Sequence, residues 1–311
     1  MSPLCQALEE YLTMRRALGF KLREPGRALR RFVEFAEEKG ASFITTELAL
    51  WWAQQPSEAD PAYWTNRLDM VRCFARYCKA LDSRTEIPAE GLLPHRFRRK
   101  PPYLYSDAEI LRLIEAAEQL PSRTGLRAAT YSTLFGLVAV TGMRSSEPIS
   151  LDHGDVDLDR GVITIRSTKF GKFRHVPIDS STQQVLDQYR RQRDHLCPAP
   201  QAPSFFLSEQ GKRVGQFAME RTFVKLSHKI GLRGPTDRRG PRLHDLRHTF
   251  AVRTILDWYR KGLDVERHLP KLATYLGHTH VKDTYWYLSA TPELLQWAVR
   301  RLEDTHEEQR P

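Results

Sequence analysis

The feature that most constrains the fold of this chain is a stretch that no helix can cross, at 83–104. It holds four prolines, which are Pro88, Pro94, Pro101 and Pro102. A proline inside a helix removes a backbone hydrogen bond and clashes with the preceding turn. A chain of 311 residues is also long enough for two ordinary domains. We therefore predict a helical N-terminal domain at 1–83, an extended linker at 84–104 and a second domain at 105–311.

Apolar residues recur at helical spacing in the first domain and predict four helices. Two of them are expected at about 3–18 and 25–39. The third begins after Thr45 or Thr46, either of which can cap it. The fourth, at about 61–81, is rich in aromatic residues and arginine. Its aromatics fit the core, whereas its arginines are either phosphate contacts or part of a solvated face. These candidate DNA-binding residues are Arg67, Arg72 and Arg76.

The linker carries a basic run between its prolines. Its cationic residues are Arg96, Arg98, Arg99 and Lys100. A basic linker laid along a DNA backbone neutralises phosphates without reading sequence. A spacer that is kept soluble by its charge has the same composition, so both interpretations stay open.

The second domain is predicted to be mainly α with a small β-sheet. Ser106 and Glu109 form a capping box that starts one helix, and the apolar run 128–140 predicts a central buried helix. Two segments rich in β-branched residues, 161–166 and 173–178, predict two strands joined by a turn at Gly171. Further helices are expected at 181–195, 214–229, 242–260 and 291–303. The whole chain is thus assigned to the α+β class.

The charge balance favours a polyanionic partner. Lysine and arginine total 48 against 38 acidic residues, which gives a formal net charge of +10. Nucleic acid is the first candidate partner, and an anionic membrane surface is the second. No apolar run has membrane-spanning length, no signal core begins the chain, and no CxxC pair predicts a zinc site. We expect an intracellular protein without a metal.

Six polar residues in the second domain carry chemistry together. They are Arg144, Lys169, His244, Arg247, His278 and Tyr287. Attack of a tyrosine on a phosphodiester needs a nucleophilic phenol, cations that stabilise the charged phosphate, and a proton for the leaving oxygen. Arginine grips a phosphate with a planar fork, and histidine and lysine stabilise charge or move protons. The set therefore contains all the groups that such a reaction requires.

The six residues lie in recognisable local strings. Arg144 lies in TGMRSSE (141–147), Lys169 in STKFGKFRHVPI (167–178), and His244 and Arg247 in LHDLRHTF (243–250). His278 lies in YLGHTH (275–280), and Tyr287 follows in DTYWYLS (283–289). In this order and spacing the strings resemble the tyrosine recombinase, or phage-type integrase, family. The resemblance is close over the C-terminal two thirds of the chain and loose over the N-terminal third.

The resemblance implies a core-binding N-terminal domain and a mixed α/β catalytic domain that close around duplex DNA. Tyr287 would form a 3′-phosphotyrosyl intermediate with no metal, ATP or other cofactor. Lys169, rather than Lys172, would protonate the leaving 5′-oxygen. Glu147 would support an arginine or base, and His278 would bind the scissile phosphate. Tyr285 and Tyr275 compete with Tyr287, and His248 is expected to point elsewhere.

The resemblance also implies how the protein would act in the cell. It would integrate or excise a mobile element, and the 257–271 segment looks like that of transposon-borne integrases. It would act as a homo-tetramer of two site-bound dimers on double-stranded DNA in the bacterial cytoplasm, at the nucleoid, with sister recombinases or accessory proteins as further candidate partners. The helix at 291–303 would dock on a neighbouring protomer or on its own domain.

Two rival classes share parts of this pattern. A type IB topoisomerase uses the same tyrosine chemistry but relaxes supercoils without a specific site. A DNA-binding accessory protein would bind without strand exchange, although binding alone requires neither His278 nor Tyr287.

Overall fold

The computed structural model describes residues 2–94, 102–166, 173–237, 240–289, 293–297 and 299. The chain divides into two units, Met1–Lys100 and Pro101–Pro311, each with its own hydrophobic core. No helix within the described residues is long and apolar enough to cross a membrane.

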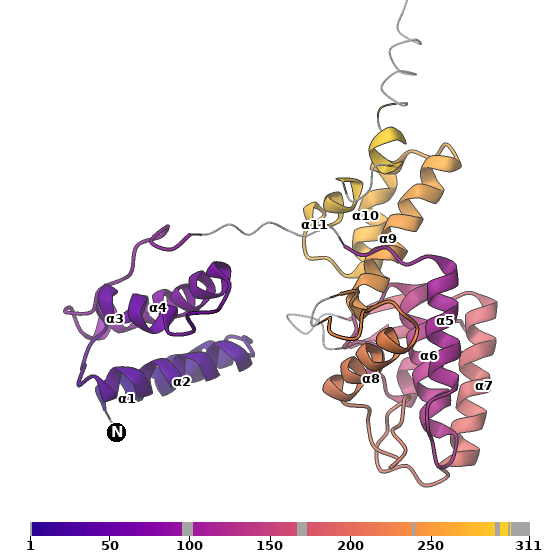
Figure 1. Ribbon diagram of the computed structural model, residues 1–311, viewed down its shortest axis with the longest axis horizontal. Helices are drawn as coiled ribbons and strands as arrows, with labels where there is room; N and C mark the ends of the chain where they lie inside the picture. Colours follow the sequence, from indigo (N-terminus) through magenta and orange to yellow (C-terminus); the bar gives the residue numbers. More distant parts are fainter. Residues whose placement is uncertain are drawn as a thin grey trace, which may run out of the picture. The chain divides into compact units, whose positions relative to one another are not determined.

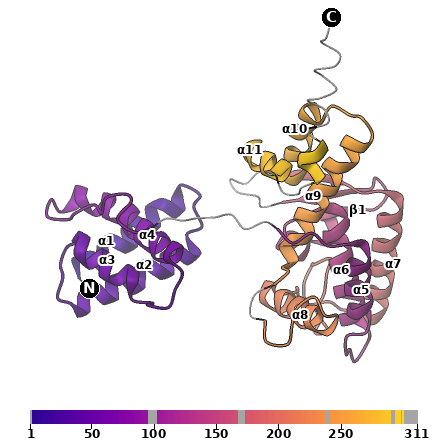
Figure 2. The same cartoon turned by 45° about the horizontal axis from the view of Figure 1, so that its top comes forward.

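The first unit is a bundle of four helices, as predicted (Figure 2). They are α1 (Pro3–Ala17), α2 (Arg23–Glu38), α3 (Thr46–Gln54) and α4 (Pro61–Leu81). Helix α4 packs against the other three, and Phe32, Trp52 and Phe74 are buried between them. Of the two candidate caps for α3, Thr45 is the one used, since its hydroxyl accepts a hydrogen bond from the Leu48 amide at 3.1 Å.

Two of the three arginines of α4 serve the fold of this unit. Arg67 is buried, donates to the carbonyl of Trp52 at 2.7 Å and lies over the Trp52 ring. Arg72 is buried as well and donates to the carbonyls of Pro88 and Ala89. These bonds to backbone carbonyls give both guanidinium groups a structural role, and DNA contacts by Arg67 and Arg72 stay predictions. Arg76 is exposed, 3.6 Å from Glu90.

The second unit is built around a central helix, α6 (Leu126–Thr141). It contacts α5 (Asp107–Glu118), α7 (Ser180–Leu196) and α9 (Leu243–Arg260), and Figure 1 shows α5, α6 and α7 as neighbouring helices. Its residues Leu134, Phe135 and Val138 are fully buried. The predicted capping box of α5 is present, with Ser106 and Glu109 bonding each other's backbone amides. Helix α8 (Gln216–Lys229) packs against α5.

The sheet has three antiparallel strands in the order β1-β2-β3. The two predicted strands are β2 (Val162–Ile165) and β3 (Arg174–Pro177), and Ile165 pairs with Arg174 at the end of the hairpin. The two-residue strand β1 (Val156–Asp157) was not predicted, because so short a segment has no periodicity to read. The turn between β2 and β3, with Lys169, Gly171 and Lys172, lies outside the described residues.

Helix α10 (Val265–Leu276) was also not predicted, because Pro270 lies inside it. An interior proline costs a helix about 3 kcal/mol. Three leucines of α10 are buried, Leu269, Leu272 and Leu276, and each contributes about 2 kcal/mol. Burial of this face therefore outweighs the proline. The short α11 (Lys282–Tyr285) and the 3-10 turn Trp286–Ser289 follow.

The described part of the C-terminal helix packs on its own domain. Leu294 is buried against the apolar cluster of α9 and α10, and Glu293 accepts a bond from Arg260 at 2.7 Å. Trp297 stacks on Tyr259, with ring centroids 6.4 Å apart. The helix was expected to dock on a neighbouring protomer or on its own domain, and residues 293–297 pack on their own domain.

Candidate active site

Arg247 forms the buried base of the site. It lies on α9, is 2% exposed, and donates to the carbonyl of Gly142 at 2.9 Å and to that of Leu276 at 2.7 Å. Burial, and then the nearby Arg144, lowers its pKa to about 10. The guanidinium is therefore still a cation at neutral pH.

Arg144 reaches the site through a left-handed turn at the end of α6. Gly142 ends that helix at φ 60°, and a Cβ there would lie 2.5 Å from a ring carbon of Phe250. Only glycine satisfies both conditions, which explains why this residue delivers Arg144. The Arg144 side chain is 37% exposed and donates to Glu147 at 3.0 Å and to the Gly277 carbonyl at 2.5 Å.

Three arginines meet the C-terminal end of α10. Consecutive carbonyls there each accept from a different one: Tyr275 from Arg174 at 2.9 Å, Leu276 from Arg247, and Gly277 from Arg144. The last carbonyls of a helix have no partner within it and carry partial negative charge. Cations therefore stabilise this end, and the contact ties α6, β3 and α9 to the turn that carries His278.

Glu147 is the shared counter-ion of Arg144 and Arg174. Its buried carboxylate accepts both terminal nitrogens of Arg174 at 2.7 Å, and it also accepts the Arg144 amide and side chain. Burial acts to raise the pKa of this carboxyl, but the bonds from Arg174 and Arg144 outweigh it and lower the pKa. Glu147 is thus ionised at neutral pH. Its contacts fit the predicted supporting role.

Arg174 was missed by the sequence analysis. It begins β3 and its side chain is 10% exposed. The only signal was an arginine at the start of an otherwise apolar strand, and that pattern is common at solvated strand ends. Its importance depends on a contact with Glu147, 27 residues away, which no local pattern encodes.

His278 follows a glycine turn, as the sequence predicted. Gly277 has φ 70°, and a Cβ on it would lie 2.8 Å from Arg174. The Nδ1 of His278 lies 2.7 Å from the hydroxyl of the fully buried Thr284. Burial, and then Arg247 and Arg144, lowers the pKa of His278 to about 4, so its imidazole is neutral at neutral pH.

Tyr287 lies among these groups and is 2% exposed. Its ring stacks on His278, with centroids 6.2 Å apart, and its hydroxyl lies 3.3 Å from the Nδ1 of His248. The expectation that His248 points elsewhere was wrong. One helical turn separates His244 from His248, so both rings project from the same face of α9, with centroids 4.8 Å apart.

His244 lies at the exposed rim of the group. Desolvation by the protein beneath its ring, and then the charge of Arg247, lowers its pKa. Its imidazole is therefore neutral at neutral pH, although it lies close to the cation of Arg247.

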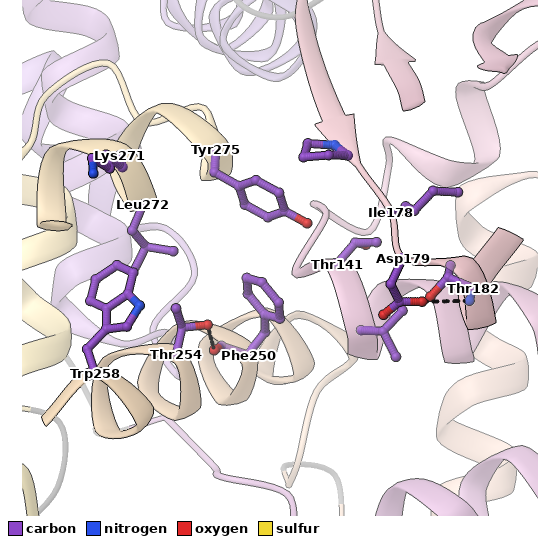
Figure 3. Close-up of a pocket in the computed structure, with 12 residues that line it drawn as sticks. Thr141, Ile178, Asp179, Thr182, Phe250, Thr254, Trp258, Lys271, Leu272 and Tyr275 are labelled. Carbon is purple, nitrogen blue, oxygen red and sulfur yellow. Dashed lines mark hydrogen bonds between the residues drawn. The ribbon is translucent and has the colours of Figure 1, made fainter. Parts of the chain in front are cut away.

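The two competing tyrosines lie in different surroundings. Tyr285 is 48% exposed. Tyr275 lines a pocket of about 430 Å³ together with Phe250, Trp258 and Ile178 (Figure 3), and none of the five described catalytic candidates lines that pocket. Its ring stacks on Phe250, and burial raises its pKa to about 12. Among the contacts of the described residues, neither phenol meets His278 or His248, and Tyr287 does.

The remaining predicted residues lie outside the described part of the chain. They are Lys169, Arg96, Arg98, Arg99 and Lys100. Their roles stay predictions.

This fold and this group of side chains define a class of enzyme that transfers DNA strands through a tyrosine. Residues 104–293 match the model of the phage integrase family, and the chain belongs to that family. It is a tyrosine site-specific recombinase, which cleaves and rejoins DNA strands. The topoisomerase and accessory-protein alternatives are not favoured.

The relatives agree with this assignment. The chain is 52% identical to a putative integrase/recombinase, y4rB, of Sinorhizobium fredii, over 97% of this chain and 98% of that protein. It is 31% identical to the tyrosine recombinase XerC of Chlamydia caviae, over 79% of this chain and 70% of that one.

Solved structures share the fold. The Tn1549 transposon integrase in complex with transposon right end DNA has a TM-score of 0.68 at 16% identity, and covers 97% of this chain and 100% of that one. The XerH recombinase bound to difH has a TM-score of 0.65 at 19% identity, over 90% and 78%. The predicted fold class is confirmed.

Proposed function

We propose that Tyr287 is the nucleophile of this recombinase, and that the enzyme integrates or excises a mobile genetic element. The position of Tyr287 carries the proposal. Its phenol is buried against His278 and His248. The negative charge of the ionised phenol raises the pKa of Arg247, whereas the positive charge of Arg144 lowers it. The phenol is thus next to the cations that a phosphate would bind.

In the proposed reaction the oxygen of Tyr287 attacks the scissile phosphorus. A bond forms between that oxygen and phosphorus, and the bond to the 5′-oxygen breaks. Arg144 and Arg247 stabilise the negative charge of the five-coordinate phosphate. Arg144 is the more exposed of the two, so it is the one that exchanges a carbonyl partner for a phosphate oxygen.

Two further groups contribute protons or hydrogen bonds. Lys169 gives a proton to the leaving 5′-oxygen. His278 is neutral, so when its Nδ1 accepts from Thr284 its Nε2 carries a proton, which it donates to a phosphate oxygen. His244 contacts the same phosphate from the rim. The 5′-hydroxyl of a partner strand then attacks the phosphotyrosine and regenerates Tyr287.

The proposed assembly is a tetramer of two site-bound dimers on double-stranded DNA. The N-terminal helical bundle serves as the core-binding domain, and Arg76 with the basic residues of the linker contact the phosphate backbone. The 52% identity to a putative integrase/recombinase supports the assignment to a mobile element.

The test is covalent trapping on nicked suicide duplexes made from the ends of the native element, without metal or ATP. Wild type, Tyr287→Phe and Tyr285→Phe are compared on denaturing gels. We expect an adduct that is lost only in Tyr287→Phe.

Loss only in Tyr285→Phe would keep the family and overturn the nucleophile. Relaxation of a plasmid that lacks any element sequence would instead favour a topoisomerase. Tight binding with no adduct on any duplex would favour an accessory role.

A further inference from the structure

His248 has no part in the reaction proposed above, yet it lies against the nucleophile. It follows Arg247 on α9 and is 7% exposed. Its Nδ1 is 3.3 Å from the hydroxyl of Tyr287. Its ring is also held edge-on by Trp286, with centroids 5.2 Å apart, and by His244. A buried imidazole with ring contacts on several sides has a fixed orientation.

The imidazole of His248 is neutral at the pH of the cell. Burial, and then the neighbouring His244, lowers its pKa to about 4. A neutral imidazole has one nitrogen that donates and one that accepts, whereas the protonated ring only donates. The Nδ1 of His248 is therefore able to accept the hydroxyl proton of Tyr287 in a hydrogen bond.

We propose that His248 is a positioning residue for the nucleophile: its Nδ1 accepts a hydrogen bond from the Tyr287 hydroxyl and fixes the direction in which the phenol oxygen points. A hydroxyl has one proton and two acceptor lone pairs. When the proton is directed at His248, the lone pairs are left to face the phosphorus. This inference rests on the proposed role of Tyr287.

His248 orients the phenol and does not remove its proton. Tyrosine has an ordinary pKa of about 10, so transfer to a ring with a pKa of about 4 would run against about six pH units. The proton passes to solvent water, and the cations around the phenol favour its ionised form. His248 thus acts through Tyr287 and requires no contact with DNA.

Two polar substitutions separate positioning from packing. In His248→Asn the amide places a polar atom where Nδ1 lies, whereas in His248→Gln the amide reaches toward Nε2. The two variants have similar size and polarity, so each is the control for the other. His248→Phe keeps an aromatic ring but has no acceptor.

The experiment uses the full-length protein on the suicide duplex under single-turnover conditions. It measures the rate of adduct formation, the dissociation constant for the duplex, and the unfolding midpoint. We expect His248→Gln and His248→Phe to form adduct about 10- to 100-fold more slowly, as expected for a misplaced nucleophile. We expect His248→Asn to recover most of the rate, with duplex binding unchanged in all three variants.

Equal rates in His248→Asn and His248→Gln would overturn the inference, because a role in packing alone does not distinguish the two amides. A wild-type rate in His248→Phe would overturn it as well. Tyr287→Phe is run beside them. An adduct in Tyr287→Phe would instead show that the proposed function fails, whatever the His248 variants do.

Discussion

Arg174 donates both of its terminal nitrogens to the carboxylate of Glu147, each at 2.7 Å. The two side chains are about 10% exposed, and Arg174 also holds the carbonyl of Tyr275. The pair joins the β2–β3 hairpin to the turn after Gly142 and to the end of α10. It therefore holds in place the two turns from which Arg144 and His278 extend.

Arg174→Met is expected to destabilise the second domain strongly. It leaves Glu147 buried with half of its partners, and loss of one member of a buried ion pair costs about 3–5 kcal/mol. The measurement is the denaturant midpoint of the full-length protein. The double variant Arg174→Met/Glu147→Met should lose less than Arg174→Met alone, because no buried carboxylate is left without its partner and Arg144, which also loses its bond to Glu147, is 37% exposed. The surface pair of the exposed Arg190 and the half-buried Asp187 gives the control, and Arg190→Met should leave the midpoint almost unchanged.

Gly142→Ala is expected to damage the site through two additive effects. A left-handed backbone costs a non-glycine residue about 1–2 kcal/mol, and the clash with Phe250 adds about 1–3 kcal/mol of overpacking. Gly262 has φ 67°, and a Cβ added to it would meet no atom within 4 Å, so Gly262→Ala suffers the first effect alone. Thermal unfolding of both variants tests this. An equal loss of stability in the two would show that the Phe250 side chain moves aside without an energetic penalty.

Arg144→Ala and Arg247→Ala are both expected to abolish adduct formation while duplex binding is largely kept. They should differ in stability. Arg247 is 2% exposed and bonds two carbonyls that would be left buried, whereas Arg144 is 37% exposed. Each unsatisfied buried carbonyl costs about 1–3 kcal/mol. Unfolding midpoints should therefore fall further for Arg247→Ala. Normal adduct formation by either variant would contradict the proposal that these two arginines bind the scissile phosphate.

The stability of the protein should fall on acidification partly through His278. Its pKa is about 4 in the folded protein, against about 6.5 when unfolded. Between these values the unfolded state binds more protons, so stability decreases as the pH falls from 6.5 to 4. One such group contributes at most about 1.4 kcal/mol per pH unit. Unfolding midpoints measured from pH 7.5 to 4.5 should have a shallower slope in His278→Asn, and an unchanged slope would show that His278 does not resist protonation.

Lys169→Ala is expected to slow cleavage, because the leaving 5′-oxygen would lack its proton donor. A 5′-bridging phosphorothioate leaves without protonation and should restore the rate of adduct formation. Failure of that rescue, with wild type active on both substrates, would remove Lys169 from the general-acid role.

Much of this protein could be read from local sequence. The apolar spacing of the first 81 residues predicted four helices, and Thr45, Ser106 and Gly142 mark helix ends where the structure has them. These signals work because a cap or a left-handed turn depends on one residue and its immediate neighbours. Each string around Arg144 to Tyr287 is likewise local, and the order of the strings along the chain predicted the family.

Only the tertiary structure decided which side chains meet. It buried Arg67 and Arg72 in the first domain, brought Arg174 to Glu147, and turned His248 toward Tyr287. It also formed α10 across Pro270, because an apolar face that packs on α9 outweighs one lost hydrogen bond. Such contacts depend on atoms that are tens of residues apart in the chain, and local periodicity carries no information about them.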